Sequence, residues 1–141
     1  MIKSIELINF FSFKQQKVEF HCLDNIMVGI NGSGKTNLLR AIKILQTSII
    51  SDGLKKLIID EWGGFDAIFF KGKTDIQNQI TIIYEFDYKV LSEFGYQFES
   101  NVFYQLTLNK ISNANSYYLI EKLYQKNPGK DFMRIGERSV Y

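Results

Sequence analysis

The stretch Gly29-Ile30-Asn31-Gly32-Ser33-Gly34-Lys35-Thr36 matches the pattern G-x-x-x-x-G-K-[ST] in full. Glycines at these spacings let the backbone turn tightly and point successive N–H groups at phosphate oxygens. In this pattern, known as Walker A, the lysine reaches the β- and γ-phosphates and the hydroxyl residue binds Mg²⁺. The stretch, called the glycine loop below, therefore predicts a binding site for a nucleoside triphosphate.

The residues around the glycine loop fit the order strand, loop, helix. Residues 25–28 form a short apolar run, typical of a strand buried on both faces. Beyond the loop, apolar residues recur at helical spacing to about Ile50: Leu38, Leu39, Ala41, Ile42 and Leu45. A helix beginning near Lys35 adds free N–H donors and the positive end of its dipole. We expect Lys35 to be the catalytic cation and Thr36 the Mg²⁺ ligand, and the nucleotide to be bound by Gly29, Gly32, Ser33, Gly34, Lys35 and Thr36.

Composition predicts one folded domain and gives no argument for nucleic acid. The chain has 141 residues, 45% of them hydrophobic, and its 17 basic and 15 acidic residues are spread along it. The single cysteine, Cys22, fits a reducing compartment. The N-terminus lacks a leader pattern and no apolar run is long enough to cross a bilayer, so we expect a cytoplasmic protein.

The pattern elsewhere predicts strands. Residues 2–13 and 18–20 are expected to be two strands around a polar break at 14–17. Alternation over residues 80–88 predicts another strand, and two further runs predict a hairpin, 102–111 and 117–125, with turn-forming residues at 112–116. A second turn is expected at Asn127-Pro128-Gly129. The fold class is thus α/β, one lobe with a phosphate-binding layer over about 1–74 and an antiparallel β-rich part over about 75–141.

Residues 57–61, Leu-Ile-Ile-Asp-Glu, imitate a Walker B strand, in which Asp60 would hold Mg²⁺ and Glu61 would activate water. Leu54, Leu57, Ile58 and Trp62, however, follow a helical stripe. We therefore predict a helix here, with neither acid at the metal. Residues 91–95, Leu-Ser-Glu-Phe-Gly, lack the paired glycines of a nucleotide-binding signature helix, and we reject that role for them.

Three stretches resemble the ATPase heads of the SMC, RecF and ABC group, which includes many bacterial AAA family ATPases. They are residues 5–14 with the core Asn-Phe-Phe-Ser-Phe, residues 25–40 around the glycine loop, and residues 64–72 with the strand after them. The resemblance implies a P-loop NTPase lobe of ABC/SMC-head type with an antiparallel β-subdomain. It also implies ATP and Mg²⁺ as cofactors, with Asn31 and Asn37 as further nucleotide contacts.

The same resemblance implies that the site is completed elsewhere. In such heads the Walker B strand and the signature helix come from a C-terminal lobe and a second head, so this chain alone is expected to bind ATP without rapid hydrolysis. A homodimer and DNA as partners are implied by resemblance only. Many relatives also have a cationic residue where Phe11 stands, and that cation reaches the bound nucleotide. In this chain the contact must come from another residue or be absent. Two alternatives remain: a compact P-loop phosphotransferase, which needs a mobile arginine lid, and a non-hydrolysing module gated by nucleotide.

Overall fold

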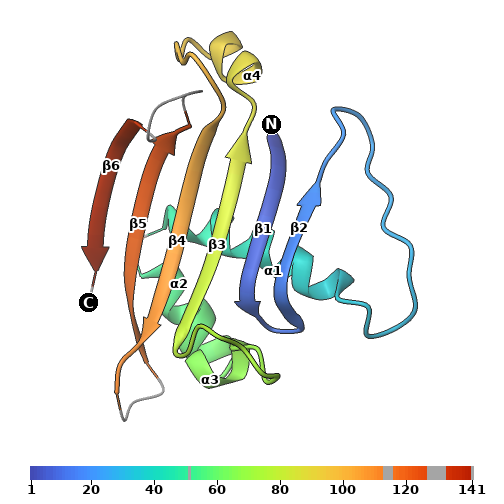
Figure 1. The fold of residues 1–141 in the computed structure, drawn as a ribbon, viewed down its shortest axis with the longest axis vertical. Coiled ribbons are helices and arrows are strands. Elements are labelled where there is room, and N and C mark those ends of the chain that lie inside the picture. Colours follow the sequence, from blue (N-terminus) through green and yellow to red (C-terminus); the bar gives the residue numbers. More distant parts are fainter. Residues whose placement is uncertain (51, 113–115, 127–132, 141) are drawn as a thin grey trace.

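The computed structural model describes residues 1–50, 52–112, 116–126 and, as backbone, 133–140. Its frame is a six-stranded antiparallel sheet in the order β2-β1-β3-β4-β5-β6 (Figure 1). The strands are β1 (Ile2–Phe10), β2 (Phe13–Glu19), β3 (Gln79–Phe86), β4 (Val102–Lys110), β5 (Tyr117–Gln125) and β6 (Met133–Val140). β1 lies between β2 and β3, so the N-terminal hairpin and the strands beyond residue 74 share one sheet.

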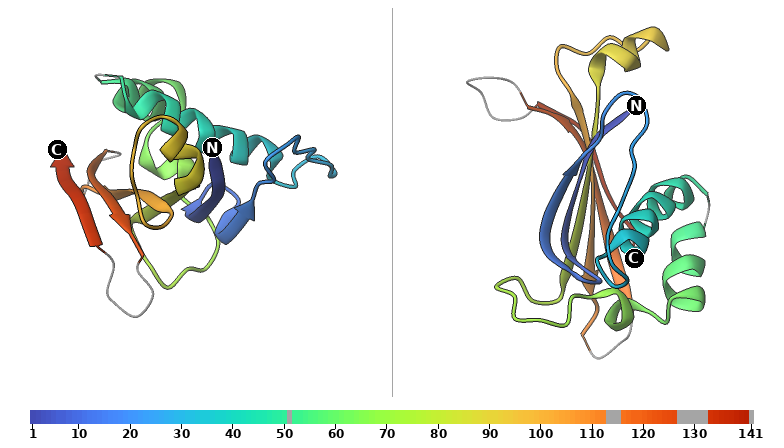
Figure 2. Two further views of the ribbon diagram at one scale, coloured as in Figure 1. Left: turned by 90° about the horizontal axis from the view of Figure 1, so that it is seen from above. Right: turned by 90° about the vertical axis from the view of Figure 1, so that its right-hand side faces the viewer.

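The helices between residues 35 and 61 cover one face of this sheet, as Figure 2 shows from two directions. The long helix α1 (Lys35–Ser48) follows the glycine loop, and α2 (Gly53–Lys55) continues into a π-helical turn (Lys56–Glu61). The short helix α3 (Phe65–Ile68) precedes β3, and α4 (Tyr88–Glu93) follows it. None of the described helices is long and apolar enough to span a bilayer.

The core lies between α1 and the centre of the sheet. Alternate residues of β3 face the helices, because successive strand residues point to opposite faces, and Ile80, Ile82 and Tyr84 are fully buried there. The Tyr84 hydroxyl donates to the Ala41 carbonyl of α1 over 2.6 Å. Burial raises the pKa of Tyr84 well above its ordinary value, so the phenol remains a donor. This contact fixes α1 against β3.

The strands predicted over 80–88, 102–111 and 117–125 are confirmed, with small shifts at their ends. The predicted break at 14–17 is wrong, because these residues lie within β2 and the chain turns at Phe11 and Ser12 instead. β2 is an edge strand whose side chains are largely exposed, so polar residues are tolerated along it. The predicted turn at Asn127-Pro128-Gly129 lies outside the described residues, as do positions 113–115 of the earlier one.

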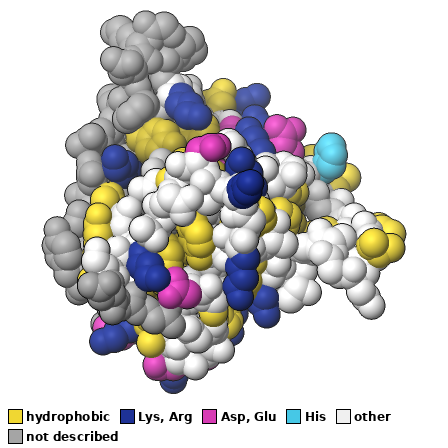
Figure 3. All heavy atoms as spheres, turned by 60° about the horizontal axis from the view of Figure 1, so that its bottom comes forward, with side chains coloured by type: hydrophobic (Ala, Val, Ile, Leu, Met, Phe, Trp, Pro, Cys, Tyr) yellow, Lys and Arg dark blue, Asp and Glu magenta, His cyan; other side chains and the backbone are white. Residues whose placement is uncertain are grey.

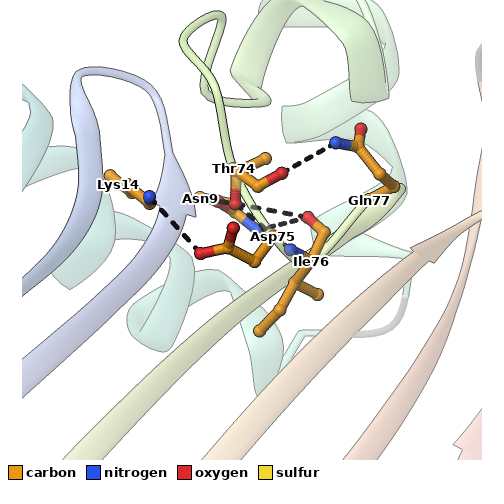
Figure 4. A network of polar contacts seen from close by, with 6 residues as sticks. All are labelled: Asn9, Lys14, Thr74, Asp75, Ile76 and Gln77. Carbon is orange, nitrogen blue, oxygen red and sulfur yellow. Dashed lines mark hydrogen bonds and ion pairs between the residues drawn. The ribbon is translucent and has the colours of Figure 1, made fainter.

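Asn9 ties the end of β1 to the segment that leads into β3 (Figure 4). Its amide nitrogen donates to the carbonyls of Ile76 and Gln79 over 2.9 and 3.0 Å, and its side-chain oxygen accepts from the Thr74 hydroxyl over 2.7 Å. The residue is fully buried and has a φ of 55°, a region that Asn tolerates better than most residues. Asn9 thereby sets the backbone direction just before Phe11 and Ser12.

We expect Asn9→Ala to lower the free energy of unfolding by about 2–3 kcal/mol, because it removes all three hydrogen bonds of a fully buried side chain, including the donor to the carbonyls of Ile76 and Gln79. Asn78→Ala is the matched control, since Asn78 has a φ of 57° and is exposed. Urea denaturation of both variants measures the difference. Equal losses would mean that backbone strain, and not the Asn9 hydrogen bonds, accounts for the effect.

Candidate nucleotide-binding site

The glycine loop curls around the side chain of Lys35. The Lys35 ammonium lies 2.5 Å from the Gly29 carbonyl, 2.9 Å from the Ile30 carbonyl and 3.2 Å from the Ser33 hydroxyl. Lysine has three donors and no acceptor, so these contacts can satisfy all three. The ammonium is thereby held across the mouth of the loop, where it places a positive charge.

Two glycines make this curl sterically feasible. A side chain at Gly29 would place its Cβ 2.7 Å from the Ser33 hydroxyl oxygen. A side chain at Gly34, where φ is 93°, would place its Cβ 2.6 Å from the edge of the Phe13 ring. The loop is therefore a cradle that any larger residue at these two positions would fill, which fits close approach of a phosphate group.

The N-terminus of α1 opens into this cradle without a cap. Gly34 is the N-cap residue, no side chain accepts from the first turn, and that turn contains no acidic residue. The first hydrogen bond into the helix is from Leu38 N–H to the Gly34 carbonyl, so the N–H groups of Lys35, Thr36 and Asn37 have no partner within the helix. Thr36 is exposed at the same end. This arrangement suits an anion whose several oxygens can accept hydrogen bonds from these N–H groups.

The β1–β2 turn supports the loop from the side. The Asn37 amide nitrogen donates to the Ser12 hydroxyl over 3.0 Å, and Phe13 packs against Gly34. The structure thus brings Gly29, Ser33 and Lys35 into contact, with Gly34 as the N-cap of the helix that begins at Lys35. Gly32 lies in the same loop with a φ of 86° and with nothing within 4 Å of its ideal Cβ. Asn31 is exposed at the loop. The Asn37 side chain contacts the hairpin and Arg40, and its direct contact with nucleotide stays a prediction.

An aromatic cluster beside Asn37 was not predicted from the sequence. The Arg40 guanidinium lies 4.6 Å from the centre of the Phe11 ring and 5.9 Å from that of Trp62. Phe11 and Trp62 meet edge to face, with centroids 5.7 Å apart. The one available signal was the aromatic residue at position 11, where the resemblance leads one to expect a cation. In this chain a cation lies over that ring.

The buried strand predicted at residues 25–28 is wrong. The segment pairs with no strand among the described residues, and Ile26 and Val28 are 87% and 91% exposed. It projects from the body of the molecule, with apolar side chains on the projecting part (Figure 3). The apolar pattern predicted a strand buried on both faces, but no described strand is paired with the segment and its apolar side chains are exposed.

The Walker B imitation at residues 57–61 is helical, as predicted. Leu57 and Ile58 are buried against the core, while Asp60 and Glu61 are exposed. The Glu61 carboxylate pairs with Lys43 of α1 over 3.0 Å. Trp62 N–H donates to the Leu57 carbonyl, which closes the wide turn of a π-helix. The acid pair is therefore on a helix surface and not at the end of a strand beside the glycine loop.

Sequence comparison matches residues 1–135 to the family described as AAA ATPase domain. The DNA replication and repair protein RecF of Caldanaerobacter subterraneus subsp. tengcongensis is 31% identical over 113 residues, which cover 80% of this chain and 29% of that protein. The RecF of Clostridioides difficile is 43% identical over 44 residues, or 31% of this chain and 12% of the relative. The chain thus spans less than a third of the length of these relatives.

Structural comparison finds a solved chain with a similar fold. A solved chain from work on ATP-driven dimerization and DNA-stimulated activation of SMC ATPases aligns with a TM-score of 0.60 at 18% identity. The alignment covers 86% of this chain and 68% of the other. The fold is therefore the α/β fold of SMC-type ATPase heads, in agreement with the sequence prediction.

We expect Glu61→Gln to change the free energy of unfolding by less than about 0.5 kcal/mol, because its pair with Lys43 is exposed and screened. Nucleotide affinity should also change little, since Glu61 lies on the helix surface. Urea denaturation and equilibrium binding of a fluorescent ATP analogue measure the two effects. A large loss of affinity would place Glu61 at the metal, in contradiction to the helical geometry.

Proposed function

Because the chain belongs to the family of AAA ATPase domains, we propose that it binds ATP with Mg²⁺ through the glycine loop, as the N-terminal lobe of a RecF- or SMC-like head. The observation that carries this proposal is the uncapped start of α1 facing a cradle with Lys35 fixed across it. The acceptor-rich triphosphate matches that set of donors.

Each residue of the site has a distinct task in this proposal. The N–H groups of the loop and of the first turn of α1 bind the phosphate oxygens, and Lys35 contributes charge to the β- and γ-phosphates. The Thr36 hydroxyl is a ligand for Mg²⁺, which supplies further positive charge when bound. Gly34 keeps this end of α1 close to the hairpin, so the donors are positioned before nucleotide arrives.

Hydrolysis needs groups that the described residues do not offer. Phosphoryl transfer requires a residue that orients the attacking water, and it requires positive charge that neutralises the departing phosphate. The glycine loop supplies positive charge on one side of the phosphate only. Lys35 and Mg²⁺ hold the ground state about as well as the transition state, which does not raise the turnover rate. We infer that this chain holds ATP and that a C-terminal lobe supplies the water-orienting carboxylate.

The exposed segment before the loop supports that inference. Leu23, Ile26, Val28 and Ile30 are each more than four-fifths exposed, which is unusual for large apolar residues close together in sequence. Strands from a C-terminal lobe would pair with the backbone of residues 25–28 and bury these side chains. We include a second head and DNA as partners in this proposal only because the relatives suggest them. The proposed location of the chain is the cytoplasm.

The compact phosphotransferase gains no support from the structure. It would need a mobile lid with arginines near the γ-phosphate, but positions 134 and 138 belong to strand β6, in register with Tyr124 and Glu121 of β5. Arg40 is fixed on α1 over the ring of Phe11. No described segment has the composition of such a lid. The ATP-binding lobe is therefore the better proposal.

We expect MgATP to raise the melting temperature of the chain by several degrees, because a ligand at about 100 times its Kd stabilises the folded state by about 2.7 kcal/mol. Lys35→Ala should remove most of this shift. Lys55→Ala, which removes an exposed cation on α2, is the matched control. Equal stabilisation of wild type and the Lys35 variant at matched ATP would exclude the glycine loop as the site.

A second expectation concerns turnover. In a single-turnover experiment with protein in excess, the isolated chain should cleave ATP at only a small fraction of the rate of a complete head. Lys35→Ala, purified identically, controls for contaminating ATPase. Addition of a C-terminal lobe in trans should raise the rate. Fast cleavage by the chain alone that disappears in Glu61→Gln would refute both the ATP-holding role and the surface position of Glu61.

A further inference from the structure

Arg40 occupies a built position one turn inside α1. Its Nη1 donates to the Asn37 side-chain oxygen over 2.9 Å, and its guanidinium lies on the ring of Phe11. The Phe11 backbone has a φ of 48°, a region uncommon for aromatic residues, and its N–H donates to the Ile68 carbonyl over 2.7 Å. A strained backbone held in this way places the ring under the guanidinium.

The side chain of Arg40 runs back toward the glycine loop. Its hydrogen-bond partner Asn37 lies three residues earlier on the helix, and Thr36 lies four residues earlier, so Arg40 is a neighbour of each on the helix surface. Asn37 in turn contacts the Ser12 hydroxyl, which would be 3.3 Å from a Cβ at Gly34. A continuous row of contacts therefore leads from the guanidinium to the edge of the cradle.

Arg40 has no acidic partner in the described part of the chain. It belongs to none of the ion pairs found there, and one hydrogen bond occupies one of its five N–H donors. Lys43, one turn further along α1, is by contrast paired with Glu61. A partly buried cation on an aromatic platform has lost part of its hydration, so contact with an anion would be favourable there.

We propose that Arg40 contacts the nucleotide, donating to the phosphate chain of the triphosphate that the glycine loop binds. The inference rests on the proposed function and adds a residue outside the loop. Phe11 and Asn37 are positioning residues, because they touch Arg40 and orient its free donors. The planar guanidinium suits phosphate oxygens, which accept two parallel hydrogen bonds from it.

The test compares the affinities for MgATP and for magnesium tripolyphosphate, which has no base or ribose, by calorimetry. Arg40→Gln should weaken both by about tenfold, the effect of losing a charge-assisted hydrogen bond. Arg40→Lys should recover part of the loss, and Phe11→Leu, which keeps the charge but removes the platform, should give a smaller loss for both ligands. Lys43→Gln, which removes a cation from the same helix, is the matched control and should bind as wild type does.

The outcomes separate this inference from the proposed function. If Arg40→Gln and wild type bind both ligands equally while Lys35→Ala binds neither, the Arg40 contact is wrong and the glycine loop stands. A loss for MgATP alone would place Arg40 at the base or ribose and overturn the phosphate contact. If wild type binds neither ligand, both proposals fail. Circular dichroism melting without ligand verifies that each variant is folded. If Arg40→Gln does not fold, the affinities of Arg40→Lys and Phe11→Leu test the Arg40 contact instead.

Discussion

The contact between Gly34 and the ring of Phe13 determines where α1 begins, and the proposed phosphate-binding geometry depends on that point. No side chain fits between them, since a Cβ at Gly34 would come within 2.6 Å of the ring. The close approach places the uncapped helix start beside the β1–β2 turn and brings Ser12 within reach of Asn37. The Tyr84 hydroxyl fixes the middle of the same helix to β3. With these two attachments, the donors at the helix start need little reorganisation to meet an anion.

The sheet contributes to the site through the hairpin at its edge. Asn9 fixes the end of β1 by three partly buried hydrogen bonds, and the chain then turns through Phe11 and Ser12 into β2, beside the start of α1. Stability and function are connected here, because the residues that order the turn also place the platform for Arg40. The segment before the glycine loop differs: its apolar side chains are exposed, and it forms no described strand pair. The cradle is thus well supported on its hairpin side and open on the side of residues 23–30.

Local signals in the sequence predicted the parts of the structure that local physics determines. The glycine spacing predicted the loop, and helical periodicity predicted α1 and the helical turn at 56–61. Alternation predicted β3, and two strand-like runs on either side of turn-forming residues predicted β4 and β5. The prediction for residues 25–28 failed because an apolar run favours a strand without showing whether its neighbours lie in the same chain. The break at 14–17 failed because polar residues suit an edge strand as well as a turn. The Phe11–Arg40–Trp62 cluster joins residues distant in sequence, so no periodicity indicates it.

The central claim is that the free N–H groups of the loop and the helix start bind the phosphates of ATP. Backbone amide resonances of the ¹⁵N-labelled chain, followed by NMR as MgATP is added, test this directly. The account predicts that the largest shifts fall on residues 32–37, with smaller changes at Ser12 and Phe13, and that magnesium tripolyphosphate reproduces the shifts at 32–37. Shifts centred on another surface, with residues 32–37 unchanged at saturating MgATP, would contradict it.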